Sequence, residues 1–348
     1  MGQSPDSSSY NNNCIGLPLV QGNADMCERI ATPQRYTSQP TKICEAGSII
    51  LSVRAPVGTV GKTFQKICLG RGVCGITSKN IEFMYQYLLN NENSWRHIEQ
   101  GGTFTAINSD DIKSFPIILP SLPEQKKIAD FLSLIDQRIE KQRQLVENLK
   151  KYKRGYFQRI ISSLETSSYE LKNIVDEYNA KSKIQNELPI LSSTLSGIKL
   201  QNDYFNKQAA SETTIGYKIV PFGYFTYRSM SDTGEFRFNL QNIIEKGIVS
   251  PAYPVFKVKE EYNAEFVEYI LNETDKIKSQ LLVKKEGGTR YALSFSKFQT
   301  LKIDLPTKSV QDKMVSQLRY ANKILTNEEG VLSNLQKLKN GLLQQMFI

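Results

Sequence analysis

The feature that most constrains this chain is an internal duplication of its helical segments. Residues 101–162 align without a gap with residues 287–348 at a constant offset of 186, and they share 16 identities over 62 positions. Chance agreement between segments of this composition would give about four identities, so one unit is written twice. Identical pairs include Gly101 with Gly287, Gly102 with Gly288, Thr103 with Thr289, Pro120 with Pro306, Gln125 with Gln311 and Gly155 with Gly341. The chain is therefore predicted to hold two copies of a unit in which a variable region precedes a long helix.

Each copy ends in a segment whose apolar residues alternate at spacings of four and three, which is the pattern of a coiled-coil seam. The seam of the first copy consists of Ile128, Leu132, Ile135, Ile139, Val146, Leu149, Tyr156 and Ile160. The seam of the second copy consists of Met314, Leu318, Ala321, Leu325, Leu332, Leu335, Leu342 and Met346. Polar residues interrupt both seams at matching positions, namely Gln142 and Lys153 in the first copy and Glu328 and Lys339 in the second.

The first long helix is predicted to begin close to residue 122. Ser121 and Glu124 have the spacing of a capping box, and Pro123 falls in the first turn, where its missing N–H costs nothing. At 1.5 Å per residue, about 39 residues span about 58 Å, which is too long for one small domain to cover. The matching seams favour pairing of the two helices within one chain, whereas the alternative is two ordinary core helices.

The composition narrows the class of protein further. The chain has 44 Lys and Arg against 35 Asp and Glu, a net charge of +9, which favours nucleic acid or another polyanion as the partner.

The five cysteines are odd in number and form no CxxC pair, so neither a disulfide framework nor a zinc ribbon is predicted. A single histidine, His97, excludes most histidine-based metal or triad chemistry. No apolar run is long enough to span a membrane and no leader pattern is present, so we expect a cytoplasmic protein.

The segments that precede the long helices are predicted to be mixed globules. In the first, strands are expected at residues 17–20 and within 43–53, a strand pair around the turn at 70–72, a short helix at 81–90 and a final strand at 116–120. The second globule repeats this order with different surface residues, including a short helix at 265–272.

The predicted fold class is α+β, with two domains that are each followed by a long helix. The predicted parts are a first domain at 1–120, a long helix at 121–165, a second domain at 166–307 and a second long helix at 308–348.

Residues 55–63 are not a phosphate-binding loop, because Gly58 and Gly61 are separated by two residues where a P-loop needs four before its Gly-Lys. They are predicted to form a glycine-rich hairpin with Lys62 exposed. The string at 250–253 lacks the second proline of a methyltransferase motif, and no nuclease pattern of clustered Asp, Glu and Lys is visible. The sequence therefore predicts no catalytic residue.

The chain resembles the specificity subunit of type I restriction-modification systems along essentially its whole length. The resemblance is carried by GQSPDSSSYNNN with LPLVQGNADM, by GSIILSVRAPVGTVG, by GGTFTAINSDDIKSFPIILPSLPEQKKIADFLSLID and by its repeat GGTRYALSFSKFQTLKIDLPTKSVQDKM. The most specific part is LPSLPEQKKIADFLSLID.

The resemblance implies a DNA-binding protein that is not an enzyme and holds neither cofactor nor metal. Each of its two target-recognition domains would recognise one half of a bipartite sequence in double-stranded DNA, and the long helices, paired as an antiparallel coiled coil, would set the spacing. Methyltransferase subunits, two in number, would dock on the helices for DNA modification, and restriction/translocase subunits would complete the complex. A helix of about 58 Å compares with about 17 base pairs of duplex.

Two departures from the family pattern are visible. The second unit opens with residues 169–175, YELKNIV, which look like the family's leading strand, whereas the first domain lacks a matching strand. Either the start lies upstream of Met1 or the first domain is incomplete. The second helix has also lost the Pro-Glu-Gln start and carries Ser309, Val310 and Gln311 instead.

Candidate DNA contacts follow from the rule that basic side chains hold phosphates while Arg, Lys, Asn and Gln recognise base edges. The duplicated glycine loops are predicted to approach DNA, with the alternative that they are tight turns needed only for the fold. The candidates in the first domain are Arg54, Lys62, Arg71, Gly101, Gly102 and Thr103. Those in the second domain are Arg228, Arg237, Lys284, Lys285, Gly287, Gly288, Arg290 and Tyr291.

Two other functions are compatible with the sequence. One is a coiled-coil scaffold whose domains bind proteins or small ligands, with the basic charge incidental. The other is a truncated, silent allele that neither folds completely nor assembles.

Overall fold

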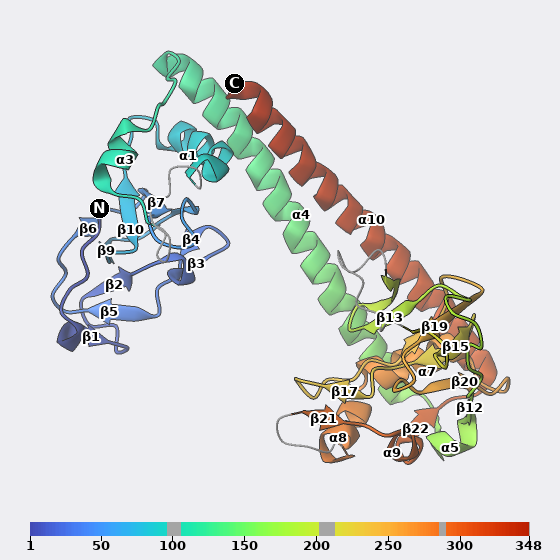
Figure 1. The fold of residues 1–348 in the computed structure, drawn as a ribbon. Coiled ribbons are helices and arrows are strands. Elements are labelled where there is room, and N and C mark those ends of the chain that lie inside the picture. The colour runs from blue at the N-terminus through green and yellow to red at the C-terminus, as the bar shows by residue number, and fades with distance from the viewer. Residues whose placement is uncertain (96–105, 202–212, 285–289, 348) are drawn as a thin grey trace. The chain divides into compact units, whose positions relative to one another are not determined.

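The computed structural model describes residues 1–95, 106–201, 213–284 and 290–347 (Figure 1). The chain divides into two compact units, of which the first comprises Met1–Val146 with Glu328–Ile348 and the second comprises Glu147–Asn327. Each unit therefore contains one globular region and a part of each of the two long helices, α4 (Leu122–Ser163) and α10 (Lys308–Met346).

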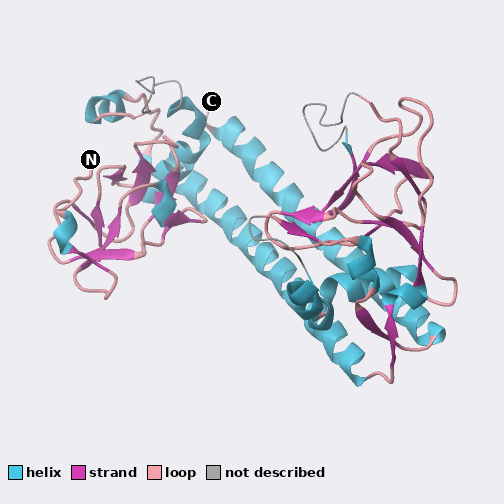
Figure 2. Cartoon of the chain, turned by 60° about the horizontal axis from the view of Figure 1, so that its bottom comes forward, coloured by secondary structure: helices cyan, strands magenta, loops and turns pink. Residues whose placement is uncertain are grey.

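The first unit contains two five-stranded sheets, with strand orders β1-β5-β2-β9-β6 and β10-β7-β8-β4-β3. Figure 2 draws the strands of the chain in magenta. The strands are β1 (Tyr10–Asn11), β2 (Leu17–Val20), β3 (Met26–Cys27), β4 (Ile30–Ala31), β5 (Arg35–Thr37), β6 (Ile43–Cys44), β7 (Ile49–Ser52), β8 (Val60–Lys62), β9 (Ile67–Leu69) and β10 (Val73–Ile76). The helices are α1 (Ile81–Asn90) and α3 (Ser109–Ser114), with short 3-10 turns at Ser7–Ser9, Asn23–Asp25 and Glu92–Ser94.

The strands predicted at residues 17–20 and within 43–53 are confirmed as β2, β6 and β7. The predicted pairing around residues 70–72 is wrong, because β9 and β10 lie in different sheets. A side chain at Gly72 would stand 2.2 Å from the Gln21 carbonyl oxygen. At this close approach of two backbone segments the chain passes from one sheet into the other. A hairpin turn was predicted there.

The predicted short helix at residues 81–90 is confirmed as α1. The Asn80 side chain caps it by accepting a hydrogen bond from the Phe83 N–H at 3.1 Å. Phe347, the residue that follows α10, contacts α1. Its ring centroid lies 5.4 Å from that of Phe83 and 5.5 Å from that of Tyr87. The globular region and the helix pair of the first unit thus share one apolar contact.

The second unit contains a four-stranded sheet in the order β12-β20-β16-β18 and the two-stranded pairs β11-β22, β13-β14, β15-β19 and β17-β21. The strands are β11 (Ser167–Glu170), β12 (Val175–Glu177), β13 (Leu191–Thr194), β14 (Gly197–Leu200), β15 (Lys218–Pro221), β16 (Phe225–Thr226), β17 (Met230–Ser231), β18 (Asn239–Leu240), β19 (Lys246–Val249), β20 (Val255–Val258), β21 (Tyr291–Ala292) and β22 (Lys302–Leu305). The helices are α5 (Leu171–Ile174), α7 (Ala264–Glu273), α8 (Asp275–Lys284) and α9 (Phe295–Gln299).

Aromatic side chains fill the core of the second unit. Phe225, Phe238, Phe256 and Phe298 are fully buried, and the Phe298 ring centroid lies 4.9 Å from those of Phe238 and Phe256. Helix α7 packs on this core and confirms the predicted short helix at 265–272. Because α7 and the sheet share the aromatic cluster, the side chains on β18 are held at fixed positions relative to α7.

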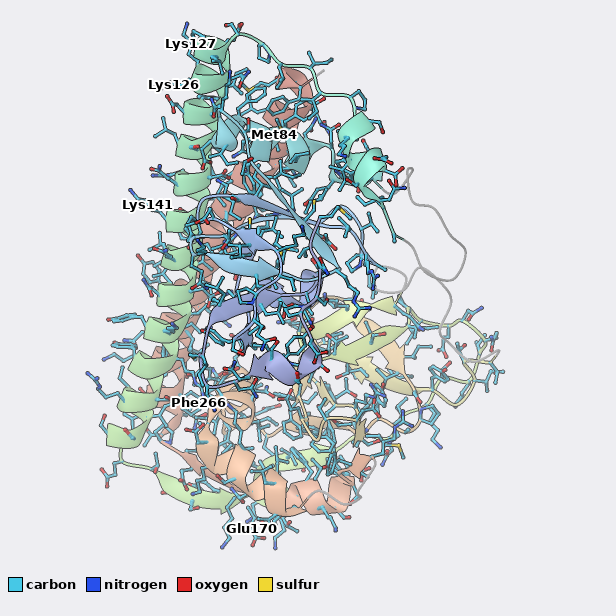
Figure 3. All side chains as sticks on the ribbon, turned by 90° about the vertical axis from the view of Figure 1, so that its left-hand side faces the viewer. Met84, Lys126, Lys127, Lys141, Glu170 and Phe266 are labelled. Atoms are coloured by element: carbon cyan, nitrogen blue, oxygen red, sulfur yellow. The ribbon has the colours of Figure 1, made fainter. Side chains whose placement is uncertain are left out.

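The two long helices pair as an antiparallel coiled coil, and α4 begins at Leu122 as predicted. Their pairing is visible within each unit separately. Residues 122–146 accompany residues 328–346 in the first unit, and residues 147–163 accompany residues 308–327 in the second. The lysines Lys126, Lys127 and Lys141 are exposed and point away from α4 (Figure 3).

One polar contact on the seam joins two residues that are equivalent in the duplication. Gln142, buried to 5% exposure, donates through Nε2 to the Glu328 carbonyl oxygen at 3.1 Å and to the Glu328 carboxylate. Glu328 follows Gln142 by the offset of 186. A buried polar pair of this kind stabilises one helix register over its neighbours, because a shift would leave the amide unpaired.

The other two interruptions of the seam, Lys153 and Lys339, each contact a polar residue of the facing helix, one in each unit. In the first unit the Lys339 ammonium lies 2.6 Å from the Asp136 carboxylate. In the second unit the Lys153 ammonium lies 2.6 Å from the Asn322 amide oxygen. Lys153 is equivalent to Lys339 and Asn322 to Asp136, so the duplication repeats this polar contact across the helix pair.

Near the end of α4 the buried side of the helix shifts by one residue. The prediction that Tyr156 belongs to the seam is wrong. Tyr156 is 40% exposed, whereas its neighbour Phe157 is 1% exposed. The inward-facing residues Gln142 and Lys153 are eleven residues apart, and so are Val146 and Phe157, which follows the natural helical repeat more closely than a strict heptad does. The equivalent residue in α10, Leu343, is buried at 6% in the same way.

The predicted final strand is present in the second unit as β22 but absent in the first. Residues 116–120 carry no strand, and Ile118 and Leu119 are 70% and 56% exposed. The physical reason is that no strand among the described residues pairs with this segment, whereas β22 is held by β11 through four antiparallel residue pairs. The apolar sequence alone does not form an isolated strand.

Candidate nucleic-acid interface

A cavity of about 750 Å³ opens on the second unit, between the β13–β14 hairpin and the segment around β17. Hydroxyl groups and charged side chains line much of it. The polar residues that line it include Ser192, Ser193, Thr194, Ser196, Arg228, Ser231, Asp232, Thr233, Glu235, Arg237 and Tyr253.

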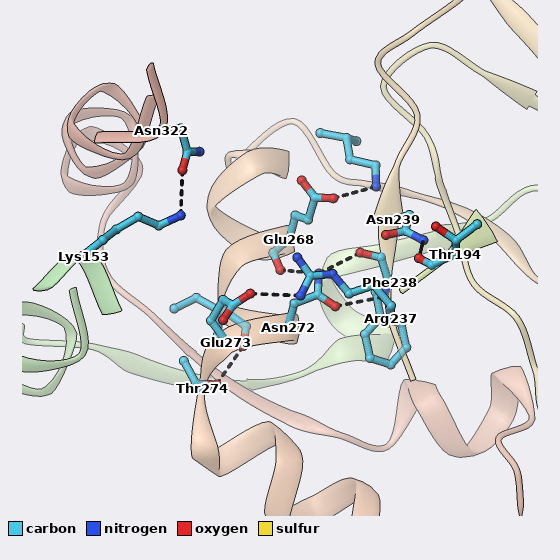
Figure 4. A network of polar contacts seen from close by, with 12 residues as sticks. Lys153, Thr194, Arg237, Phe238, Asn239, Glu268, Asn272, Glu273, Thr274 and Asn322 are labelled. Carbon is cyan, nitrogen blue, oxygen red and sulfur yellow. Dashed lines mark hydrogen bonds and ion pairs between the residues drawn. The ribbon is translucent and has the colours of Figure 1, made fainter. Parts of the chain in front are cut away.

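The β13–β14 hairpin that forms one wall is tied to β18. Asn239, 1% exposed, donates through Nδ2 to Ser193 Oγ at 2.8 Å and to the Thr194 carbonyl oxygen at 2.9 Å (Figure 4). At the turn, Gly197 adopts a φ of +110°, which favours glycine. The serine hydroxyls of this wall are therefore presented by a braced hairpin.

Arg237 enters the same cavity from the segment just before β18. Its backbone neighbour Phe238 is held to α7 by the Asn272 side chain, which accepts from the Phe238 N–H at 2.9 Å and donates to the Phe238 carbonyl at 2.8 Å (Figure 4). The Arg237 guanidinium also pairs with Glu273 at 2.9 Å. Arg237 is thus a half-buried cation whose direction is fixed by α7.

A second group of charges lies around β17. The Arg290 Nε donates to Asp232 Oδ1 at 2.8 Å, and Arg228 lies 3.9 Å from the same carboxylate. The hydrogen bond from Arg290, and then its charge, hold the pKa of the Asp232 carboxyl below its usual value. One carboxylate between two exposed guanidinium groups leaves a net positive charge, which suits a phosphate or a base edge.

An equivalent backbone contact lies close to an arginine in each unit. In the second unit Met230 pairs with Ala292, and the Leu293 N–H donates to the Ser229 carbonyl at 2.9 Å. In the first unit the equivalents of Ala292 and Leu293 are Ala106 and Ile107. Ala106 forms a bridge with Arg54, and the Ile107 N–H donates to the Val53 carbonyl at 3.1 Å. Each unit therefore joins the residues that follow its GGT segment to a backbone segment with an arginine, Arg54 in the first unit and Arg228 in the second.

The structure places the predicted contact residues differently. Arg228 and Arg237 line the cavity, and Arg290 and Tyr291 join them through the β17–β21 pair. Arg54 and Arg71 of the first unit are exposed, and Arg71 contacts Ser4 Oγ through its N–H and Nε. Lys284 is not at the cavity, because its ammonium donates to the Thr300 carbonyl at 3.0 Å. Gly101, Gly102, Thr103, Lys285, Gly287 and Gly288 lie outside the described residues.

The expectation that Lys62 is exposed is wrong. Its side chain is 17% exposed, pairs with the Glu82 carboxylate and lies 4.0 Å above the centroid of the Tyr85 ring. Both partners lie on α1. The hairpin pattern around Lys62 does not predict these contacts, because α1 lies further along the chain. This lysine stabilises the packing of α1 on β8.

The hairpin serines, Asp232 and Tyr253 are cavity residues that the sequence reasoning missed. Ser192 to Ser196 lie 32 to 36 positions before Arg228, and long-range hydrogen bonds of Ser193 and Asn239 hold the hairpin beside the segments that carry the two arginines. A polar turn of the Thr-Leu-Ser-Gly type is too common to identify a site by itself.

A buried carboxylate beside Arg237 gives a stability prediction. Glu268 accepts a hydrogen bond from the Leu240 N–H at 2.9 Å, and burial raises the pKa of its carboxyl above the usual value. Since the folded-state pKa exceeds the unfolded-state pKa, ionised Glu268 destabilises the folded state at neutral pH, and this penalty disappears as the pH falls to the unfolded pKa. Glu268→Gln, which keeps the acceptor, should raise the free energy of unfolding by about 1 kcal/mol at pH 7 and by nothing near pH 4.

Urea titrations of the two proteins at both pH values measure this difference. The matched control is Glu273→Gln, which removes a carboxylate from the same helix but weakens the ion pair with Arg237 and should give no gain. An equal gain for Glu268→Gln at both pH values would contradict the assignment of the penalty to ionisation.

A second surface lies on the helix pair of the second unit. An apolar groove of about 490 Å³ is lined by Leu149, Tyr152, Lys153, Tyr156, Phe157, Ser316, Gln317, Tyr320, Ala321, Ile324 and Leu325. Tyr152 and Tyr320 are 69% and 70% exposed, and the buried oxygen of the Gln317 amide has no hydrogen-bond partner among the described residues. Exposed aromatic side chains around an unsatisfied acceptor are typical of a protein-docking surface.

The duplication places apolar residues at the equivalent positions of the first unit. Phe131, Leu134 and Leu338 correspond to Gln317, Tyr320 and Tyr152, and they are 47%, 63% and 54% exposed. Each unit thus has an apolar patch on its own part of the helix pair.

Among the described residues, no group of three or more His, Cys, Asp and Glu side chains could hold a metal ion. No helix within the same residues is long and apolar enough to cross a membrane.

The duplicated domains and the antiparallel helix pair resemble the architecture of type I specificity subunits. Residues 4–151 match the family model of the type I restriction modification DNA specificity domain. The putative type I restriction enzyme MjaX specificity subunit of Methanocaldococcus jannaschii is 39% identical over 176 residues, which are 49% of this chain and 40% of that protein. The MjaIX specificity subunit of the same organism is 30% identical over 130 residues, 36% of this chain and 30% of the relative. The chain therefore aligns with less than half the length of these relatives.

Solved structures agree with this chain in fold. The type I restriction-modification S subunit from M. genitalium has a TM-score of 0.58 at 15% identity and is matched over 100% of this chain and 92% of its own. A chain from a structure of type I restriction-modification complex assembly and conformational transition has a TM-score of 0.57 at 15% identity, over 92% of this chain and 87% of its own. These comparisons confirm the resemblance to type I specificity subunits that the sequence motifs indicate.

Proposed function

We propose that this chain is the non-catalytic DNA-recognition subunit of a type I restriction-modification complex. The observation that carries the proposal is the repeated contact between the residues that follow the GGT segment and a backbone segment with an arginine, at Ala106 with Arg54 and at Ala292 with Met230. A net charge of +9 supports a polyanionic partner.

Each domain would recognise one half of a bipartite target in double-stranded DNA. The domains are those predicted at residues 1–120 and 166–307, and the helices at 121–165 and 308–348 would set the spacing between the half-sites. Arg228 and Arg237 supply donors for base edges in the second domain, while the serine hydroxyls of the cavity suit phosphate oxygens. The side chains that line the two domains differ, so two unlike half-sites are expected.

The apolar patches on the helix pair would bind the methyltransferase subunits, one on each patch. Two equivalent patches favour two copies of the same partner, because a surface repeated by duplication offers the same docking geometry twice. The restriction/translocase subunits would join through this assembly.

The experiment is to co-express the chain with the methyltransferase subunit of its system and to map methylated adenines in the host genome. A motif with two defined halves and a fixed gap is the expected result. Assembly without any methylated motif would contradict recognition by this chain. Measurement of DNA affinity against salt is the second arm, since phosphate contacts give a steep loss of affinity with salt. No affinity at any salt concentration would favour the scaffold function.

A further inference from the structure

The segment that leads into β18 directs its side chains alternately to the core and to the cavity of the second unit. Phe236 packs against the aromatic core and Phe238 is buried within it, whereas Glu235 and Arg237 line the cavity. The Asn272 side chain binds both the N–H and the carbonyl of Phe238 (Figure 4). Because neighbouring side chains of an extended segment point to opposite sides, this anchor also fixes the side of the chain on which Glu235 lies. Glu235 is therefore a cavity residue placed next to Arg237.

A turn before Glu235 presents its carboxylate. Gly234 has a φ of +80°, in the region that favours glycine, and its N–H donates to Ser231 Oγ at 3.0 Å. Ser231 is itself paired with Tyr291 of β21. Glu235 follows this turn and is exposed. The carboxylate thus stands on a backbone that is held from both ends.

The two carboxylates of the cavity differ in their partners. Asp232 accepts a hydrogen bond from Arg290 at 2.8 Å and lies 3.9 Å from Arg228. Within the described residues, the Glu235 carboxylate makes neither a hydrogen bond nor an ion pair. The charged residues that line the cavity are Arg228, Arg237, Asp232 and Glu235, so their formal charges cancel. A phosphate would be repelled by the Glu235 carboxylate, so this acceptor suits a neutral hydrogen-bond donor.

Two buried polar atoms beside the cavity also lack a partner. In the part of the chain that the structure describes, these atoms are Arg237 Nε and Asn239 Oδ1. Nδ2 of the same Asn239 binds Ser193 and Thr194, which line the cavity. An unsatisfied donor and an unsatisfied acceptor match a ligand that carries both kinds of atom, either directly or through a water. The edge of a base pair carries both, whereas a phosphate carries acceptors alone.

We propose that Glu235 is a specificity-determining residue of the second domain, where it accepts a hydrogen bond from the exocyclic amino group of a cytosine in the DNA half-site. This inference rests on the proposed function. An arginine donates to O6 and N7 of guanine and a carboxylate accepts from N4 of cytosine, so Glu235 beside Arg228 and Arg237 matches the two bases of one C·G pair. A guanine or thymine facing Glu235 would offer it only acceptors in the major groove.

The test uses the complex of the full chain with its methyltransferase subunit and duplex oligonucleotides that carry the methylated motif. Each cytosine of the motif, on either strand, is replaced in turn by pyrimidinone, which keeps the ring and lacks the exocyclic amino group. At one position this replacement should weaken binding about 10-fold for the unaltered chain and less than about 2-fold for Glu235→Ala. The matched control is Glu245→Ala, which removes an exposed carboxylate outside the cavity and should behave as the unaltered chain does.

Equal sensitivity of the unaltered chain and of Glu235→Ala at every cytosine would overturn the proposal. A loss that depends on Glu235 but occurs only where an adenine is replaced by purine, which lacks the amino group of adenine, would overturn the assignment to a C·G pair. The absence of any methylated motif would overturn the proposed DNA recognition and this inference with it. A clear motif combined with equal sensitivity would overturn the inference alone.

Discussion

Replacing Tyr320 with glutamate is expected to reduce the number of methyltransferase subunits that co-purify with this chain from two to one. Tyr320 is 70% exposed and lines the apolar groove of the second unit together with Tyr152 and Ile324. Aromatic residues at the centre of an interface commonly contribute about 2 kcal/mol or more, and a carboxylate buried there without a partner adds a desolvation cost. Native mass spectrometry of the co-expressed complex counts the bound subunits.

The duplication supplies a matched variant for the other patch. Leu134 is the equivalent of Tyr320 in the first unit and is 63% exposed, so Leu134→Glu should also leave one bound subunit, and the double variant should leave none. Phe64→Glu is the control, because Phe64 is 69% exposed but lies outside the helix pair. Retention of two subunits by the double variant would remove these patches from the docking surface.

The helix pair is the part of the fold that the sequence predicts best. Apolar spacing and the offset of 186 are local properties, so the pairing of like seams follows from them. The partners of the polar interruptions do not follow, because identifying Glu328 as the partner of Gln142 requires the antiparallel register. The drift from Tyr156 to Phe157 also needs the real helical repeat, which a four-three pattern only approximates.

The sequence predicts which residue types contribute to the candidate interface. It does not predict which of these residues lie together in the fold. Arginines at strand ends in a basic chain are reasonable contacts, and Arg228 and Arg237 do line one cavity. Lys62 has the same charge but belongs to the packing of α1, because Glu82 and Tyr85 reach it from 20 and 23 positions along the chain. Residues 116–120 have the composition of a strand, but no strand in the described part of the chain pairs with them. In both cases the deciding contact is non-local.

Replacing Arg228 with alanine is expected to relax one half of the methylated motif and leave the other half intact. Its guanidinium is exposed at the rim of the cavity and is held only loosely, 3.9 Å from Asp232. Loss of an arginine that recognises a base edge costs about 1–3 kcal/mol, a decrease in affinity of about 5- to 150-fold, and widens the sequence tolerated at that position.

The first unit offers the reciprocal experiment. Arg54 bridges to Ala106, the equivalent of Ala292, whose partner Met230 lies two residues after Arg228, so Arg54→Ala should relax the opposite half of the motif. Arg159→Ala removes the same charge from an exposed position on α4 and should change neither half. If Arg228→Ala weakened binding to all sequences equally and lowered the dependence of log affinity on log salt by about one, Arg228 would contact a phosphate. Identical relaxation of both halves by either variant would mean that the two units do not recognise separate half-sites, because independent domains can fail only one at a time.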